Sequence, residues 1–152
     1  MKMHFLTGLS ALGLVVCFVL ILTGAAPASA AETLTLKVYE GYNFASHAVM
    51  KSGDPKADIS FYVNTGRRGA MSFQLGAIGA KQLKECGKAK PNASVLQNRA
   101  QWGNSANAPS AGDYFALEGA DGKSLYLVKI IGFENQGKAS SYWQLTLSWE
   151  KL

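Results

Sequence analysis

The sequence predicts a mainly β protein, built as a two-layer antiparallel β-sandwich or an open barrel with one short helix near residues 77–86. Three observations lead to this expectation. The chain contains 16 Gly, seven Phe, six Tyr and three Trp, a composition that suits sheets better than helical bundles. Its C-terminal segment alternates strictly between apolar and polar residues. Clusters of Gly, Asn, Asp, Ser and Pro separate the apolar segments.

Residues 1–30 have the organisation of a secretory signal peptide. Lys2 supplies a positive charge beside the amino terminus, and a mostly apolar run covers residues 5–22. Ala28-Ser29-Ala30 then places small residues where a signal peptidase accepts them. We therefore expect cleavage after Ala30, or one residue later, with an uncleaved membrane anchor as the alternative. The protein is expected to be secreted or periplasmic.

Cleavage after Ala30 would leave residues 31–152, a length typical of a single β-rich domain. This part carries fourteen basic and ten acidic residues, a mild net charge of +4 that predicts no nucleic-acid partner. Its only cysteine is Cys86, so it can form no internal disulfide. A single cysteine in an oxidising compartment is expected to be buried or to pair with another molecule.

The first half of the mature chain is expected to form three strands. Residues 34–39 alternate between apolar and polar side chains, which is typical of a half-buried strand. Residues 59–63 and 71–75 are rich in β-branched, aromatic and apolar side chains. The glycine-bounded loop between them carries Arg67 and Arg68, so the pair is predicted to be a hairpin with an arginine tip.

The helix is predicted over residues 77–86 because this segment contains good helix formers and is followed by Gly87, a residue typical of helix C-caps. Residues 41–44 are expected to form a bend. Residues 88–111 show no clear period and are expected to form a long loop, in which Trp102 is the large apolar residue of the second half. Such loops are usually functional or mobile.

The last part of the chain has the clearest pattern. Strands are expected over residues 113–118 and 125–133, joined by a Gly-Ala-Asp-Gly turn. Over residues 143–149, Trp and Leu alternate with Gln, Thr and Ser, so one face of this strand is expected to be apolar and the other polar and solvent-exposed. The three strands together predict an antiparallel meander.

Residues 112–131 resemble the late hairpin of HmuY-like secreted haem-binding domains, which carry a similar DGK turn and close on an aromatic-rich strand, as residues 142–149 do here. The run Asp58-Ile59-Ser60-Phe61, followed by Asn64-Thr65-Gly66, is similar to the early strand and glycine loop of that family. The resemblance implies an exported all-β domain that holds a ligand. The best-known haem site of the family uses two axial histidines, whereas the mature chain has only His47.

Haem binding would therefore require a Met or Tyr as second axial ligand, and Met50 and Met71 are the available methionines. No catalytic residues and no metal site are predicted. The sequence has no G-x-S-x-G elbow, no Walker loop, no dinucleotide fingerprint and no calcium loop of the EF-hand type. A carboxylate pair for glycoside hydrolysis stays open, because nothing singles out two of the ten acidic residues.

The remaining candidates are residues suited to ligand binding. Arginines at a loop tip can pair with a phosphate, a carboxylate or an acidic glycan, and aromatic rings can support a sugar or another flat ligand. For each of them a solubilising or core-packing role is the alternative. The candidate binding residues are Trp102, Arg67, Arg68, Tyr42 and His47, with Phe44 and Tyr114 as further aromatic platforms.

These observations favour an exported, non-enzymatic β module that binds a small molecule, a glycan or a protein through its loops. The first alternative is a structural or assembly subunit of an envelope or surface complex, because exposed strand edges recruit partners. The further alternatives are a haem-binding protein and a carboxylate-based hydrolase. No cofactor other than haem, no nucleic-acid partner and no membrane span after cleavage are expected.

Overall fold

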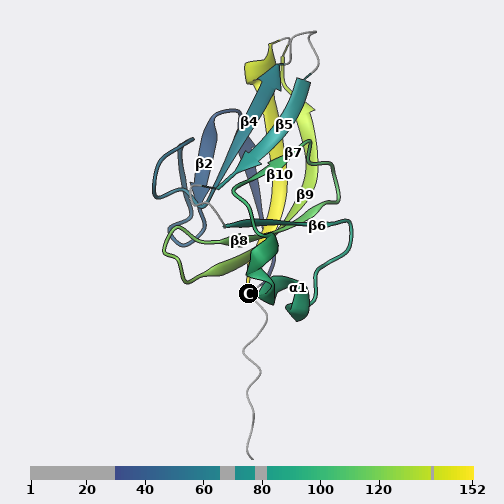
Figure 1. The fold of residues 1–152 in the computed structure, drawn as a ribbon. Coiled ribbons are helices and arrows are strands. Elements are labelled where there is room, and N and C mark those ends of the chain that lie inside the picture. Colours follow the sequence, from purple (N-terminus) through teal and green to yellow (C-terminus); the bar gives the residue numbers. More distant parts are fainter. Residues whose placement is uncertain (1–29, 66–70, 78–81, 138) are drawn as a thin grey trace, which may run out of the picture.

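The computed structural model describes residues 30–65, 71–77, 82–137 and 139–152, and these form two antiparallel sheets of five strands each (Figure 1). The sheets face each other without closing into a barrel, so the fold is a β-sandwich. This outcome confirms the predicted fold class and selects the sandwich over the open barrel.

The sheets are named sheet A, with strand order β1-β10-β9-β8-β6, and sheet B, with strand order β3-β2-β4-β5-β7. Sheet A contains β1 (Glu32–Lys37), β6 (Leu83–Gly87), β8 (Tyr114–Glu118), β9 (Leu125–Asn135) and β10 (Trp143–Lys151). Sheet B contains β2 (Glu40–Asn43), β3 (Ala48–Lys51), β4 (Ile59–Thr65), β5 (Met71–Gly76) and β7 (Ser105–Asn107). The short helices are α1 (Ala93–Gln97) and the 3-10 helices η1 (Arg99–Gln101) and η2 (Ser140–Tyr142).

The core lies between the sheets and follows from the alternation of side chains along each strand. In β10, Leu145 and Leu147 are fully buried, while Thr146 between them lies on the outer face. Val128 and Ile130 of β9 point into the same core, as does Phe61 of β4 on the opposite sheet. Burying such side chains contributes about 1.5–3 kcal/mol each, so this layer is the main source of stability.

The predicted meander and the strand pairing of the predicted hairpin are confirmed, whereas the arginine tip of the hairpin lies outside the described residues. Strands β4 and β5 pair in antiparallel register, with Phe61 opposite Leu75 and Val63 opposite Phe73. Strands β8, β9 and β10 are neighbours in sheet A, in the order expected from their short connections. The N-terminal strand predicted over residues 34–39 is β1, which pairs with β10 and forms an edge of sheet A.

The helix predicted over residues 77–86 is wrong where the structure describes it. Leu83–Gly87 is the strand β6, and residues 78–81 lie outside the described residues. Leu83 is buried opposite Leu117 of β8, and its own backbone N–H and carbonyl group bond to Gly103 on the other side. Burial against β8 therefore outweighs the helix preference of Lys84 and Glu85, which amounts to only tenths of a kcal/mol per residue.

Two further local predictions are wrong. The expected bend over residues 41–44 is mostly the strand β2, which pairs with β3 and β4. The expected loop over residues 88–111 contains α1, η1 and β7. Helix α1 begins after Asn92, whose side-chain Oδ1 accepts a hydrogen bond from the backbone N–H of Val95 at 3.2 Å. This is an ordinary N-cap, and its Asn stands where such a residue is preferred.

The segment with α1 and η1 is fastened to sheet A by side-chain contacts. Arg99 forms an ion pair with Glu118 of β8 at 2.8 Å, and Lys84 of β6 donates to Gln101 Oε1 at 2.7 Å. Ala116 and Leu127, on the outer face of sheet A, are buried although they do not belong to the core between the sheets.

No helix within the described part of the chain is long and apolar enough to cross a membrane.

Candidate functional site

A pocket on the outer face of sheet A is called the Lys129 pocket. Tyr114 of β8, Lys129 of β9 and Ser148 of β10 are direct cross-strand neighbours and form one row of it. The pocket has a volume of about 240 Å³. It is lined by Ala31, Lys90, Tyr114, Leu127, Lys129, Ser148, Trp149 and Glu150.

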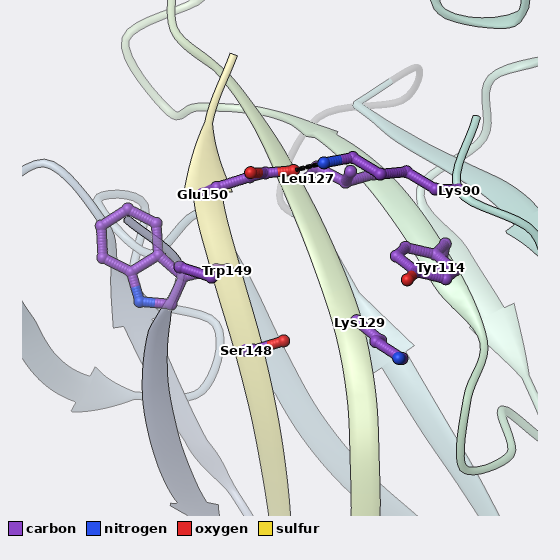
Figure 2. A pocket seen from close by; sticks show the side chains of 8 residues that line it. Lys90, Tyr114, Leu127, Lys129, Ser148, Trp149 and Glu150 are labelled. Atoms are coloured by element: carbon purple, nitrogen blue, oxygen red, sulfur yellow. Dashed lines mark ion pairs between the residues drawn. The ribbon is translucent and has the colours of Figure 1, made fainter. Parts of the chain in front are cut away.

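The wall of the Lys129 pocket contains a lysine and a glutamate that neutralise each other, and its floor is apolar. Lys90 forms an ion pair with Glu150 across the pocket (Figure 2). Leu127 lies beneath this pair and is only 3% exposed, so it forms a dry floor. The indole of Trp149 points away from the other labelled side chains, toward the core (Figure 2).

Lys129 is the cation of this pocket without a carboxylate partner. Its Nζ lies 5.3 Å from the centroid of the Tyr114 ring, a cation–π distance. Among the described residues, no Asp or Glu oxygen lies within ion-pair distance of this Nζ. Ser148 adds a hydroxyl beside it in the same row. The arrangement can accept an anionic group at Lys129 and an apolar ring edge at Tyr114.

The second pocket, called the His47 pocket, opens at one end of the sandwich and has a volume of about 250 Å³. Its floor consists of buried rings that pack on one another, with Phe44 4.8 Å and Tyr126 5.7 Å from the ring of Trp149. Its rim is polar. The lining residues are Glu32, Phe44, Ala45, His47, Tyr126, Trp149 and Lys151.

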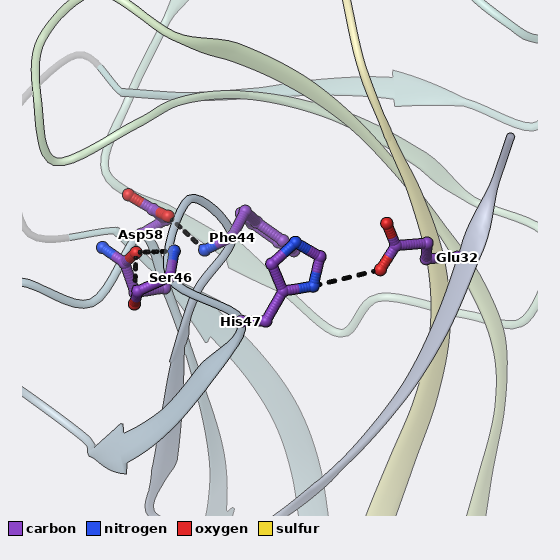
Figure 3. A network of polar contacts seen from close by, with 6 residues as sticks. Glu32, Phe44, Ser46, His47 and Asp58 are labelled. Atoms are coloured by element: carbon purple, nitrogen blue, oxygen red, sulfur yellow. Dashed lines mark hydrogen bonds and ion pairs between the residues drawn. The ribbon is translucent and has the colours of Figure 1, made fainter. Parts of the chain in front are cut away.

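His47 is held at the rim in an unusual backbone conformation. Its φ of 52° lies in the left-handed region, which is uncommon for residues with a side chain. The imidazole Nδ1 lies 3.2 Å from Glu32 Oε2, a contact shown in Figure 3. The centroid of the imidazole ring lies 5.4 Å from that of the Trp149 ring. The contact with Glu32 of β1 and the ring contact therefore fix where this side chain points.

Asp58 ties the turn that carries His47 to the opposite side of the sandwich. Its carboxylate accepts hydrogen bonds from the backbone N–H groups of Phe44 and Ala120, each at 2.6 Å (Figure 3 shows the Phe44 bond). The residue is only 3% exposed. Burial raises the pKa of Asp58, while the two N–H groups act in the opposite direction. Asp58 is thus a structural anchor beneath the His47 pocket.

Asp121 makes the stability of the nearby turn depend on pH. Its carboxylate accepts from the backbone N–H groups of Ser124 and Lys123 and from the Ser124 hydroxyl, which lowers its pKa from 3.8 to about 2. A lowered pKa means that the stabilising contribution is present above the ordinary value and is lost as the pH falls through about 2. As the pH is lowered over that range, we expect the thermal midpoint of Asp121→Asn to fall less than that of the parent protein. Equal acid slopes in both proteins would contradict this expectation.

The structure separates the residues predicted for binding. His47 lines a pocket, but Tyr42 is 6% exposed and Trp102 is 5% exposed. Tyr42 packs on Phe44, with ring centroids 5.3 Å apart. The guanidinium of Arg99 lies 4.1 Å from the centroid of the Trp102 ring. In this structure, therefore, Tyr42 and Trp102 offer little open ring surface.

Arg67 and Arg68 lie outside the described residues. Of the two further aromatic platforms, Phe44 is part of the buried floor of the His47 pocket and Tyr114 lines the Lys129 pocket. Sequence reasoning missed Lys129 and Ser148. The sequence does contain a signal for Lys129, because it is the only charged residue in the apolar run of β9 from Leu125 to Ile131.

The structure gives no reason to place a metal site or a reactive thiol among the described residues. No group of three or more His, Cys, Asp or Glu side chains there is arranged to hold a metal ion. Burial raises the pKa of the Cys86 thiol, which disfavours the reactive thiolate. Cys86 lies in β6 of sheet A, whereas His47 precedes β3 of sheet B.

Comparison of the chain with known protein families, with characterised proteins and with solved structures finds no match. The two pockets described above and the exposed faces of the sheets are therefore the features from which a function can be inferred.

Proposed function

We propose that this protein is an exported, non-catalytic β-sandwich module that binds a small carboxylate-bearing ligand, such as an acidic sugar, in the Lys129 pocket. The single observation that carries the proposal is the amine of Lys129, which faces a pocket without a carboxylate partner among the described residues. A part-buried cation of this kind is stabilised when a ligand supplies the missing negative charge.

The neighbours of Lys129 favour a ligand that is more than a bare anion. Tyr114 offers a ring beside the amine, and Ser148 offers a hydroxyl in the next strand. Lys90 is already neutralised by Glu150, so the pocket has room for one further negative charge. A six-membered sugar with a carboxylate combines an apolar edge, hydroxyls and one charge, which matches this set.

The pattern of residues 1–30 supports export. Cleavage after Ala30 would create a new amino terminus at Ala31, which lines the Lys129 pocket. The free α-amino group would add a second cation at the rim. An anionic ligand would then bind more tightly to the processed chain than to the precursor.

The alternatives have less support. Hydrolysis of a glycoside by two carboxylates needs both of them in one cleft, but each pocket is lined by a single carboxylate, Glu150 or Glu32. Assembly through the edge strand β1 is disfavoured because Glu40 accepts the backbone N–H of Lys37 at 2.8 Å, and because β1 begins and ends with a charged residue. Haem binding would have to use His47 as the one histidine of the mature chain, and no methionine is among the described residues that line the pocket containing it.

The proposal is tested by calorimetric titration of the processed protein with galacturonate, glucuronate and benzoate. Galactose, which is galacturonate without the carboxylate, is the matched ligand control. We expect at least one of the three carboxylates to bind and galactose to bind far more weakly. Lys129→Gln should weaken that binding by about 1.5–3 kcal/mol, because a hydrogen bond to a charged group is lost.

The matched protein control is Lys123→Gln, which removes an exposed lysine from the turn between β8 and β9. It should bind as the parent does, and both variants should keep the thermal midpoint of the parent. Absence of binding to all three carboxylates, or equal binding by the Lys129 and Lys123 variants, would refute the proposed function. Native mass spectrometry of the protein from its producing cells would then show whether another ligand is bound.

A further inference from the structure

The outer face of sheet B carries a row of polar and aromatic side chains that lies outside both pockets described above. Tyr62 of β4 lies opposite Gln74 of β5, and Gln74 lies opposite Asn107 of β7. Tyr39, just before β2, extends the row on the other side, because its backbone N–H bonds to Phe61 and its ring lies 6.4 Å from that of Tyr62. These four residues are called the Tyr39 face.

The Tyr39 face carries no charge. The neighbouring described strand side chains on this side of the sheet are also uncharged, namely Met50, Asn64 and Ser105. Ser60 is buried next to Gly41, over which Ala57 packs, so it does not belong to the open part of the face. The outer face of sheet A is different, because Lys84, Glu118, Lys129 and Glu150 project from it. The two sides of one sandwich therefore suit ligands of different charge.

Two tyrosines give the Tyr39 face its aromatic surface. Tyr39 is 57% exposed, and its φ of 65° is a conformation that a tyrosine rarely adopts. An exposed aromatic side chain on a strained backbone is a pattern typical of binding sites. Tyr62 leans over Gly76, where an added Cβ would lie 3.2 Å from the ring carbon Cε2. The glycine thus lets the Tyr62 ring approach the sheet.

The amide side chains supply hydrogen-bonding groups next to these rings. Asn64 Nδ2 donates to Gln74 Oε1 at 2.8 Å, which holds both side chains in place. This bond leaves the carbonyl oxygen of Asn64 and the amide nitrogen of Gln74 to bond elsewhere. Asn107, at the end of the row, is exposed and offers another donor and another acceptor.

We propose that the Tyr39 face binds a neutral oligosaccharide as a second ligand site. Sugar rings present flat C–H surfaces that pack on tyrosine rings, and their hydroxyls match amide groups in both donor and acceptor roles. A charged polymer would lose hydration on this face without meeting an opposite charge. The proposal does not depend on the Lys129 pocket, which lies on the other sheet.

The test is electrophoresis of the protein, as purified from the cells that express the full chain, in native gels containing xyloglucan, galactomannan or hydroxyethyl cellulose. We expect at least one of these neutral polymers to retard the protein. Tyr39→Asn and Tyr62→Ala should each reduce the retardation and raise the dissociation constant for the polymer roughly tenfold, as expected for central aromatic contacts. Asn is chosen at position 39 because it tolerates a positive φ, so the fold should be preserved.

Tyr142→Ala is the matched control, since Tyr142 is 55% exposed but lies in η2, outside the Tyr39 face. It should be retarded like the parent protein, and so should Lys129→Gln. Migration unaffected by all three neutral polymers, or unaffected by the substitutions at Tyr39 and Tyr62, would overturn the inference. Loss of retardation in Lys129→Gln alone would also overturn it and would assign the polymer to the other pocket.

Discussion

Replacing Asp58 with alanine is expected to lower the free energy of unfolding by about 2–4 kcal/mol. The substitution leaves the backbone N–H groups of Phe44 and Ala120 without their acceptor in a buried site. An unsatisfied buried polar group costs about 1–3 kcal/mol, and two groups are affected. Urea unfolding followed by circular dichroism measures the change.

Two further variants make this test specific. Asp58→Asn keeps one oxygen but turns an NH2 donor toward one of the two N–H groups, so it should also destabilise the protein strongly. Asp54→Ala is the control, because Asp54 Oδ1 accepts only one exposed backbone bond, from Lys56. It should cost about 1 kcal/mol or less. An equal loss in the Asp58 and Asp54 variants would contradict the anchoring role.

The second large effect is expected for Trp149→Ala, which should cost about 3–5 kcal/mol of unfolding free energy. The Trp149 ring is 5% exposed and is surrounded by the rings of Phe44, Tyr126, Tyr42 and His47, at centroid distances of 4.8, 5.7, 6.4 and 5.4 Å. Its removal opens a cavity between the sheets. The indole points away from the Lys129 pocket, so the loss should appear in stability and not in ligand binding to that pocket.

Trp143→Ala provides the comparison within the same strand. Trp143 stands at the other end of β10, is only partly buried and has an indole Nε1 without a hydrogen-bond partner among the described residues. Its removal should cost roughly half as much or less, and it should leave binding to the Lys129 pocket unchanged. A larger loss for Trp143 than for Trp149 would place the main packing centre at the opposite end of the sandwich.

Much of the sheet structure could be read from local pattern. The alternation of Trp, Leu and polar residues over 143–149 identifies β10 and its buried face, and the turn residues between 113 and 133 identify the β8–β9 hairpin. These signals are strong because a strand with one buried face must alternate with a period of two. Neighbouring strands with short connections also pair by default.

The misassigned segment around β6 shows where local pattern fails. Lys84, Glu85 and the following glycine favour a helix when considered alone. The segment is a strand because Leu83 has a partner, Leu117, that is far away in the sequence. Gly87 keeps a positive φ of 73°, but it ends a strand at a register shift instead of capping a helix. Local preference is small compared with the burial that such a distant partner provides.

The candidate site was less predictable than the fold for the same reason. Aromatic residues are suited both to core packing and to ligand binding, and nothing in the sequence around Tyr42 or Trp102 separates the two roles. Likewise, a lysine in a strand is unremarkable until the positions of all carboxylates are known. Lys129 becomes a candidate only because Lys88, Lys90 and Arg99 take the nearby acidic partners.

The residue pattern alone therefore determines the fold class, most strands and the expectation of export, because these depend on composition, on period and on short-range turns. The tertiary structure decides which aromatic rings face solvent, that Lys129 lines a pocket without a carboxylate partner among the described residues, and which sheet face carries no charge on its described strand side chains. Each of these properties depends on side chains brought together from strands distant in sequence. Tyr39 beside Tyr62, and Lys129 between Tyr114 and Ser148, are contacts of this kind.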